Sequence, residues 1–173
     1  QVVQPLQMRY LACDPFASAT PAGVELVGLE RLLSESDFVC ISCALTEQTR
    51  GLINADRLAL MKPTAYLLNT ARGGIVNEEA LYECLAAGRI AGAALDCFVG
   101  EPITERHRFA ELDNVILAPH AICWTHELFR DIGRTASQQM IDLAHGRVPK
   151  GVVNPEVLDR PSFQEKWSRL RVE

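Results

Sequence analysis

The sequence predicts an α/β fold with a doubly wound parallel sheet, and three observations support this prediction. Short apolar runs are separated by segments with helical periodicity, which is the pattern of strands that alternate with helices. The runs are almost continuously apolar, as is typical of strands covered on both faces. The chain has 173 residues, of which 48% are hydrophobic and 23% charged, enough for one substantial globular core.

Five apolar runs are the expected strands. They are Met8–Cys13, Phe38–Ser42, Ala65–Asn69, Ala91–Leu95 and Val115–Leu117.

Three helices are expected between these strands. The first is Val27–Leu33. The second, Asn54–Met61, starts at a possible N-cap residue and ends before Pro63. The third, Asn77–Ala87, has the clearest signals, because an N-cap candidate and two glutamates at its start are followed by Gly88 just past its end.

A long helix from about Thr125 to His145 should follow the last strand. Beyond Gly146 the chain is rich in proline and charge, and Phe163–Leu170 is interpreted as a short amphipathic helix after a connector. The long helix should bury one apolar side, made of Leu128, Ile132, Met140, Ile141 and Leu143.

Charge and composition exclude several classes of function. The formal net charge of -5 argues against general affinity for nucleic acid or anionic membranes, but not against a local basic site for a small anion. No apolar stretch is long enough to span a bilayer, and there is no signal-peptide pattern.

The six cysteines show no disulfide-scaffold rhythm. Cys13, Cys40, Cys84 and Cys97 lie in or beside apolar runs, which favours buried thiols in a reducing, cytoplasmic compartment. Cys40 and Cys43 match C-x-x-C, but residues three apart in a strand face opposite sides, which argues against a metal or redox site. We expect no metal site.

Asp14 places a carboxylate at the end of the first expected strand. In a Rossmann-like dinucleotide-binding fold, an acidic residue there accepts hydrogen bonds from the adenosine ribose. The G-x-G-x-x-G turn should lie roughly 20 residues earlier, but no glycine precedes Asp14. We therefore expect part of a longer protein, whose sheet lacks its first strand and glycine loop. The alternative is that Asp14 merely forms an Asp-Pro turn.

Several long blocks, in order, make the sequence similar to one known family. They are LTEQTRGLI at 45–53, MKP at 61–63, LNTARGGIVNE at 68–78, GAALDCFVGEP at 92–102 and DNVILAPH at 113–120. Residues 43–125 resemble the nucleotide-binding half of the D-isomer-specific 2-hydroxyacid dehydrogenases.

The resemblance implies an oxidoreductase that passes a hydride between NAD and a small 2-hydroxy or 2-oxo acid, usually as a homodimer. It also implies a partial dinucleotide-binding domain at residues 1–148. Residues 149–173 would then be a connector and a helix that packs on a substrate domain outside this chain. The fragment alone should be inactive.

Arg72 follows the N-T-A of the third block, where the family arginine binds the carboxylate and 2-oxo group of the substrate. A guanidinium suits this task because its planar fork grips a carboxylate bidentately. Gly73 and Gly74 would let the backbone turn closely beside the ligand. The alternative is that Arg72 ends a strand and pairs with a surface acid.

The resemblance makes His120 the general acid and base, with Glu101 as the carboxylate that favours its charged form. Other matches to cofactor contacts complete the predicted site. The predicted cofactor-binding residues are Asp14, Thr46, Thr70, Ala71, Arg72, Asp96 and His120.

Four residues of the predicted catalytic and cofactor-binding sets come shortly after apolar runs: Arg72, Asp96, Glu101 and His120. The carboxyl ends of parallel strands meet at one edge of a sheet, so we expect these side chains to converge there. Asp96 alone is weak evidence, because strand-end aspartates also form turns.

The chain departs from the family at several positions. Ser42 and Ala44 stand where many members have His and Pro, and Asn77 replaces a common aspartate. Trp124, in a loop where smaller residues are frequent, would either wall the nicotinamide pocket or pack under the loop. Three further histidines have no matching context and are interpreted as surface residues: His107, His126 and His145.

A second function class stays open at this stage. The chain could be a non-catalytic, dehydrogenase-like module for interaction or nucleotide sensing. The combination of Arg72, Glu101 and His120 argues against it, because a scaffold does not need all three.

Overall fold

The computed structural model describes residues 7–170, which divide into two compact units between Ile122 and Cys123. The first unit contains every strand of the described residues, and the second contains the last helices. The predicted division after residue 148, into a dinucleotide-binding domain and a connector with a helix, stays a prediction.

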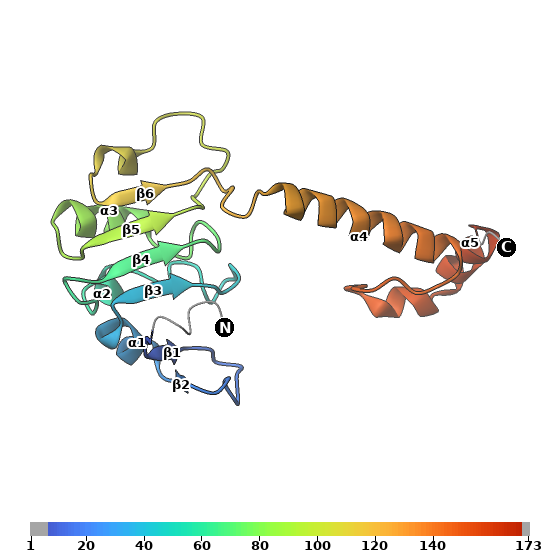
Figure 1. The fold of residues 1–173 in the computed structure, drawn as a ribbon, viewed down its shortest axis with the longest axis horizontal. Coiled ribbons are helices and arrows are strands. Elements are labelled where there is room, and N and C mark those ends of the chain that lie inside the picture. The colour runs from blue at the N-terminus through green and yellow to red at the C-terminus, as the bar shows by residue number, and fades with distance from the viewer. Residues whose placement is uncertain (1–6, 171–173) are drawn as a thin grey trace. The chain divides into compact units, whose positions relative to one another are not determined.

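The first unit is built on a parallel sheet of four strands in the order β3-β4-β5-β6. The strands are Phe38–Ile41, Tyr66–Asn69, Gly92–Leu95 and Val115–Leu117. Figure 1 shows their arrows side by side and pointing in one direction, so their carboxyl ends share one edge. The predicted α/β fold with a parallel, Rossmann-like sheet is confirmed.

A separate parallel pair precedes this sheet. It consists of β1 (Tyr10–Ala12) and β2 (Val24–Leu26). The predicted strand Met8–Cys13 is therefore shorter than expected, and β2 was not predicted. Exposed ion pairs hold this pair and the next helix together: the Arg9 guanidinium bonds Glu25 at 2.8 Å and Glu35 at 2.9 Å.

The helices begin where the capping residues indicated. In α2 (Ala55–Leu58) and α3 (Glu78–Ala86), the side chains of Asn54 and Asn77 accept from Arg57 N–H and Ala80 N–H at 3.0 Å. Each bond satisfies one backbone donor that the first helical turn leaves open. The first helix, α1 (Leu29–Glu35), lies two residues later than expected.

One face of the main sheet is buried, and the other is not. Val39 and Leu67 are at most 3% exposed and adjacent in register, whereas Phe38, Tyr66 and Ile116 are 53%, 45% and 73% exposed. Within the described residues the strands are therefore covered on one face only. The apolar runs predicted two covered faces, and this was wrong within the described residues. A hydrophobic pattern shows which side chains are apolar but not which other segments pack against them.

The second unit contains α4 (His126–Ala144), the 3₁₀ helix η3 (Pro155–Asp159) and α5 (Pro161–Leu170). Thr125 caps α4 by accepting from Leu128 N–H at 3.1 Å. In α5 the indole N–H of Trp167 donates to Leu143 O at 2.6 Å.

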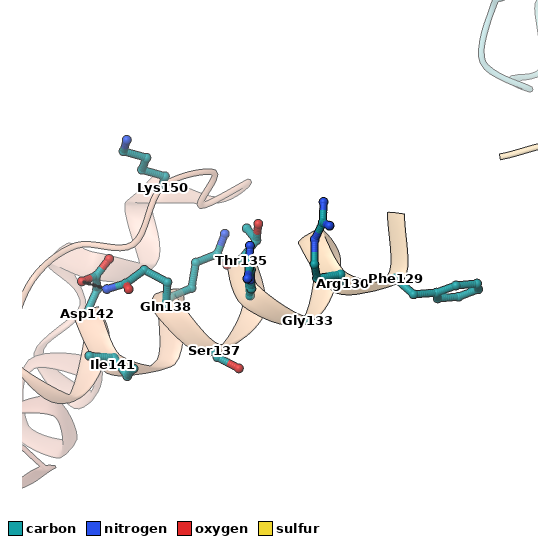
Figure 2. A pocket seen from close by; sticks show the side chains of 11 residues that line it. Phe129, Arg130, Gly133, Thr135, Ser137, Gln138, Ile141, Asp142 and Lys150 are labelled. Atoms are coloured by element: carbon teal, nitrogen blue, oxygen red, sulfur yellow. Dashed lines mark hydrogen bonds between the residues drawn. The ribbon is translucent and has the colours of Figure 1, made fainter. Parts of the chain in front are cut away.

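The predicted buried side of α4 is wrong for this structure. Ile132, Met140 and Ile141 are 56%, 68% and 48% exposed, and α4 has no buried residue. The predicted apolar stripe exists, but within its unit only short segments pack against it. Figure 2 shows a pocket of the second unit that is lined mostly by polar α4 side chains and by Lys150, and Ile141 is the one stripe residue among the lining residues that the figure draws.

The cysteine prediction is partly wrong. Cys84 and Cys97 are buried, whereas Cys13 and Cys40 are exposed. Cys40 lies on the uncovered face of the sheet, and Cys13 follows the short strand β1, so neither receives the cover that their apolar neighbours indicated.

Candidate active site

The carboxyl edge of the main sheet brings together side chains from three segments. Arg72 follows β4, Asp96 and Glu101 follow β5, and His120 follows β6. Because β4, β5 and β6 are adjacent and parallel, the segments that leave them start side by side. Figure 1 shows these strand ends along one edge of the first unit.

His120 and Glu101 form the closest polar contact of this edge. The His120 Nδ1 and Glu101 Oε2 atoms lie 2.5 Å apart, and Phe98 N–H donates to Glu101 Oε1 at 2.6 Å. Burial raises the pKa of Glu101, but the bonds from His120 and Phe98 and the nearby Arg72 charge outweigh it and hold this pKa below its usual range. The His120 side chain is 41% exposed, so the pair is accessible to a ligand.

Asp96 holds the loop that carries His120. Its side chain is buried and accepts from the N–H groups of Ala121 at 2.9 Å and Ile122 at 3.3 Å. His120, immediately before them, has a φ of 56°, a conformation that is uncommon for a non-glycine residue and needs support from its surroundings.

Arg72 lies in a turn that Asn69 organises. The buried Asn69 amide donates to Arg72 O at 3.0 Å and accepts from Ala71 N–H at 3.2 Å. The guanidinium is exposed and bonds Ala71 O at 2.6 Å. Within residues 7–170 it forms no ion pair, so the alternative of a surface acid partner finds no support there.

Gly73 brings the Arg72 turn into contact with the segment that carries Glu101. A Cβ atom at Gly73 would lie 2.0 Å from Phe98 O and 2.7 Å from Val99 N. Only a glycine permits this approach. Gly74, with a φ of 82°, makes the positive-φ turn that leads toward α3.

The buried Cys97 thiol lies among these charged groups. Burial, together with the Glu101 and Asp96 carboxylates, raises the pKa of Cys97 to about 11, and Arg72 opposes that rise. The thiol donates to Asn69 O at 3.5 Å. At neutral pH Cys97 is therefore a protonated packing residue and not a nucleophile.

The remaining predicted cofactor residues also follow strand ends: Asp14, Thr46 and Thr70 are exposed, and Ala71, next to Arg72, is half-buried. Thr46 follows β3, and its N–H donates to Thr49 Oγ1 at 2.7 Å. Thr70 directly follows β4. Asp14 follows β1 and accepts from Phe16 N–H at 2.9 Å, the bond that a turn-forming aspartate makes.

Two of the other three histidines are exposed, as expected, and the third is not. His126 and His145 are exposed, and the His145 ring contacts Ile141 O at 2.8 Å near the end of α4. His107 is only 19% exposed and stacks on Phe109, with ring centroids 5.1 Å apart.

Trp124 lies in the second unit, where its ring centroid is 5.8 Å from that of Phe129.

Sequence reasoning missed Asn69 as a residue that shapes this edge. The only available signal was its position as a polar residue that ends an apolar run. The pocket of Figure 2 belongs to the second unit and contains none of the predicted site residues.

Comparisons with known proteins identify the family of the chain. The sequence model of the D-isomer specific 2-hydroxyacid dehydrogenase NAD binding domain matches residues 1–121. A glyoxylate reductase of Korarchaeum cryptofilum is 44% identical over 144 residues, covering 82% of this chain and 43% of the relative. A D-3-phosphoglycerate dehydrogenase of Synechocystis is 40% identical over 167 residues, covering 92% of this chain and 30% of the relative.

Solved structures give the same result. The NAD complex of a D-isomer specific 2-hydroxyacid dehydrogenase from Lactobacillus delbrueckii has a TM-score of 0.79 at 27% identity, covering 88% of this chain and 51% of that one. D-lactate dehydrogenase with NAD+ from Lactobacillus jensenii gives 0.81 at 26% identity, covering 88% and 50%. The chain thus spans about half or less of the length of these relatives. Within residues 7–170, no helix has the length and apolar character needed to span a membrane.

Proposed function

The chain belongs to the D-isomer specific 2-hydroxyacid dehydrogenases, through their NAD-binding domain, and on this premise we propose that it serves a hydride transfer between NAD and a small 2-oxo or 2-hydroxy acid. The observation that carries the proposal is the His120–Glu101 pair, at 2.5 Å, together with Arg72 after the adjacent strand, whose charge acts on Glu101 and which forms no ion pair in the described residues. An acid–base pair next to a free cation suits a substrate that carries both a carbonyl group and a carboxylate.

Arg72 anchors the substrate in this proposal. Its exposed guanidinium offers several N–H donors, of which one contacts Ala71 O. The remaining donors bind the substrate carboxylate and polarise the adjacent carbonyl. Asn69 and Gly73 fix the turn from which this side chain projects.

His120 moves the proton. In the direction of reduction it gives a proton to the carbonyl oxygen as that oxygen becomes a hydroxyl, and it accepts the proton in the reverse direction. The Glu101 carboxylate lies against Nδ1 and stabilises the charged imidazole. The other ring nitrogen, Nε2, is the one left for the substrate.

NAD, when bound, supplies the hydride donor or acceptor. The groups at the strand ends fit such a ligand by their hydrogen-bonding chemistry, since they offer hydroxyls, backbone N–H donors and an exposed carboxylate acceptor. Asp96 differs from these groups because it is buried, with 4% of its surface exposed. Both of its carboxylate oxygens already accept hydrogen bonds from backbone N–H groups. The residues proposed to hold NAD are Asp14, Thr46, Thr70, Ala71, Arg72, Asp96 and His120.

Substitution of Arg72 tests the proposal. In the protein expressed from its complete coding sequence, NADH oxidation is followed with glyoxylate, hydroxypyruvate and pyruvate. Arg72→Ala should nearly abolish turnover, and Arg72→Lys should recover little of it, because an ammonium lacks the bidentate fork. Wild-type rates in Arg72→Ala would contradict the proposed role. A wild-type protein that binds NAD and reduces none of the three acids would favour a nucleotide-sensing module instead.

The 173-residue segment by itself is expected to be inactive. It contains no G-x-G-x-x-G turn, which binds the pyrophosphate in this type of fold.

A homodimer of the whole protein is the assembly we propose, and sedimentation velocity would test it. Cytoplasmic localisation is also a proposal, which fractionation would test.

A further inference from the structure

The segment that carries Glu101 is irregular and exposed. It runs from the end of β5 to the 3₁₀ helix η2 (Arg108–Glu111), and residues 99–106 are all exposed. Such a segment loses much conformational entropy when it is ordered, and few apolar contacts are available to hold it. Glu101 therefore needs polar anchors if its carboxylate is to stay against His120.

One carboxylate outside the predicted site contacts both ends of this segment. Glu78, in the first turn of α3, accepts from Val99 N–H through Oε1 at 2.7 Å. Its Oε2 atom lies 3.7 Å from Nε2 of His107. Val99 and His107 stand on either side of Glu101 in the sequence. The Glu78 side chain thus links the two ends of the segment that carries Glu101.

His107 is fixed in the orientation that this contact needs. Its Nδ1 accepts from Phe109 N–H at 3.4 Å, so in the neutral ring the hydrogen is on Nε2, which points to Glu78. The His107 ring also contacts the rings of Phe98 and Phe109, whose centroids are 5.0 and 5.1 Å away. Phe98 in turn supplies the N–H that holds Glu101 Oε1 at 2.6 Å.

We propose that Glu78 and His107 are positioning residues for the reaction proposed above: they hold the segment at Val99 and at residue 107, so that Glu101 stays bonded to His120. The inference rests on the proposed function. Neither residue has to touch the substrate, because each acts through Glu101.

Helix stabilisation does not explain the Glu78 contacts. An acid in the first turn of α3 interacts favourably with the helix dipole wherever its side chain points. Glu79 is also in that turn, but it pairs with the half-buried side chain of Arg108, the first residue of η2, and with none of residues 99–107. Glu79 is therefore a matched control for Glu78.

The test compares Glu78→Ala, Glu78→Gln and Glu79→Ala in the protein expressed from its complete coding sequence. We expect Glu78→Ala to lower kcat about tenfold with little change in KM, since small displacements of a catalytic pair are costly. The alkaline limb of kcat/KM for 2-oxo acid reduction should move to lower pH, because a displaced Glu101 no longer stabilises the charged imidazole. Glu78→Gln keeps an acceptor for Val99 N–H but turns an N–H₂ donor toward His107, so it should recover only part of the rate.

Glu79→Ala should match the wild type in rate and in pH profile. Amide hydrogen exchange gives a readout that does not depend on catalysis: Val99 N–H should exchange faster in Glu78→Ala than in Glu79→Ala. Unchanged exchange at Val99, or equal rate losses in the two alanine variants, would overturn the proposal. If the wild-type protein reduces no 2-oxo acid, the proposed function fails, and the exchange at Val99 still decides whether Glu78 holds the segment.

Discussion

Replacing Gly73 with alanine should separate the turn that carries Arg72 from the segment that carries Glu101. The added Cβ would lie 2.0 Å from Phe98 O and 2.1 Å from Phe98 C, both of which are backbone atoms. Cβ contacts under 3.0 Å are essentially never seen, so one backbone must move by at least about 1 Å. A displacement of that size in a catalytic constellation lowers the rate about 100-fold.

The same crowding should destabilise the fold by about 1–3 kcal/mol, as overpacking does elsewhere. Urea unfolding and kcat/KM with a 2-oxo acid measure the two effects. Gly133→Ala in α4 is the control, because its Cβ meets nothing within 4 Å; alanine at a helix interior should stabilise by about 0.5–1 kcal/mol. A Gly73→Ala protein with wild-type stability and rate would refute the close approach of the two segments.

Two further predictions concern buried groups near this edge. Asp96→Asn replaces one acceptor oxygen with an N–H₂ group that cannot bond Ala121 or Ile122 N–H, so the free energy of unfolding should fall by about 1–3 kcal/mol; equal urea midpoints would contradict this. Burial raises the pKa of Cys97 from near 9.0 to about 11, so the thiol ionises at lower pH in the unfolded protein than in the folded one. The contribution of the buried thiol to the free energy of unfolding is therefore present below pH 9 and is lost as the pH rises toward 11. Between these limits the loss should be about 2–3 kcal/mol larger than in Cys97→Ala, measured by urea unfolding at both pH values, and equal losses would refute it.

The shared edge at which the candidate site segments start could be predicted because it depends on the sheet alone. Once Tyr66–Asn69, Gly92–Leu95 and Val115–Leu117 are identified as adjacent parallel strands, whatever follows them must start along one edge. The helix starts could be predicted for a similar reason: Asn54 and Asn77 cap through bonds to residues three positions away. Local chemistry fixes such features.

The burial of a face by segments far away in the sequence could not be predicted. The exposed face at Phe38 and the exposed stripe at Met140 carry the same apolar residues as buried surfaces would. A hydrophobic period says which side chains share a face, but not what lies against that face. The strand β2 was missed for another reason, since its three residues are too few to establish a hydrophobic period.

The contacts that hold the candidate site follow from the cost of burying polar groups. Asn69 and Asp96 are 2% and 4% exposed, and a buried polar atom without a partner costs about 1–3 kcal/mol. Both residues meet this demand with backbone groups of the site segments: Ala71 and Arg72 for Asn69, Ala121 and Ile122 for Asp96. Because losing these bonds would leave a buried amide or carboxylate unsatisfied, the turn at Arg72 and the loop after His120 cannot move freely without destabilising the core. The burial that stabilises the sheet therefore also orders the residues proposed to bind substrate.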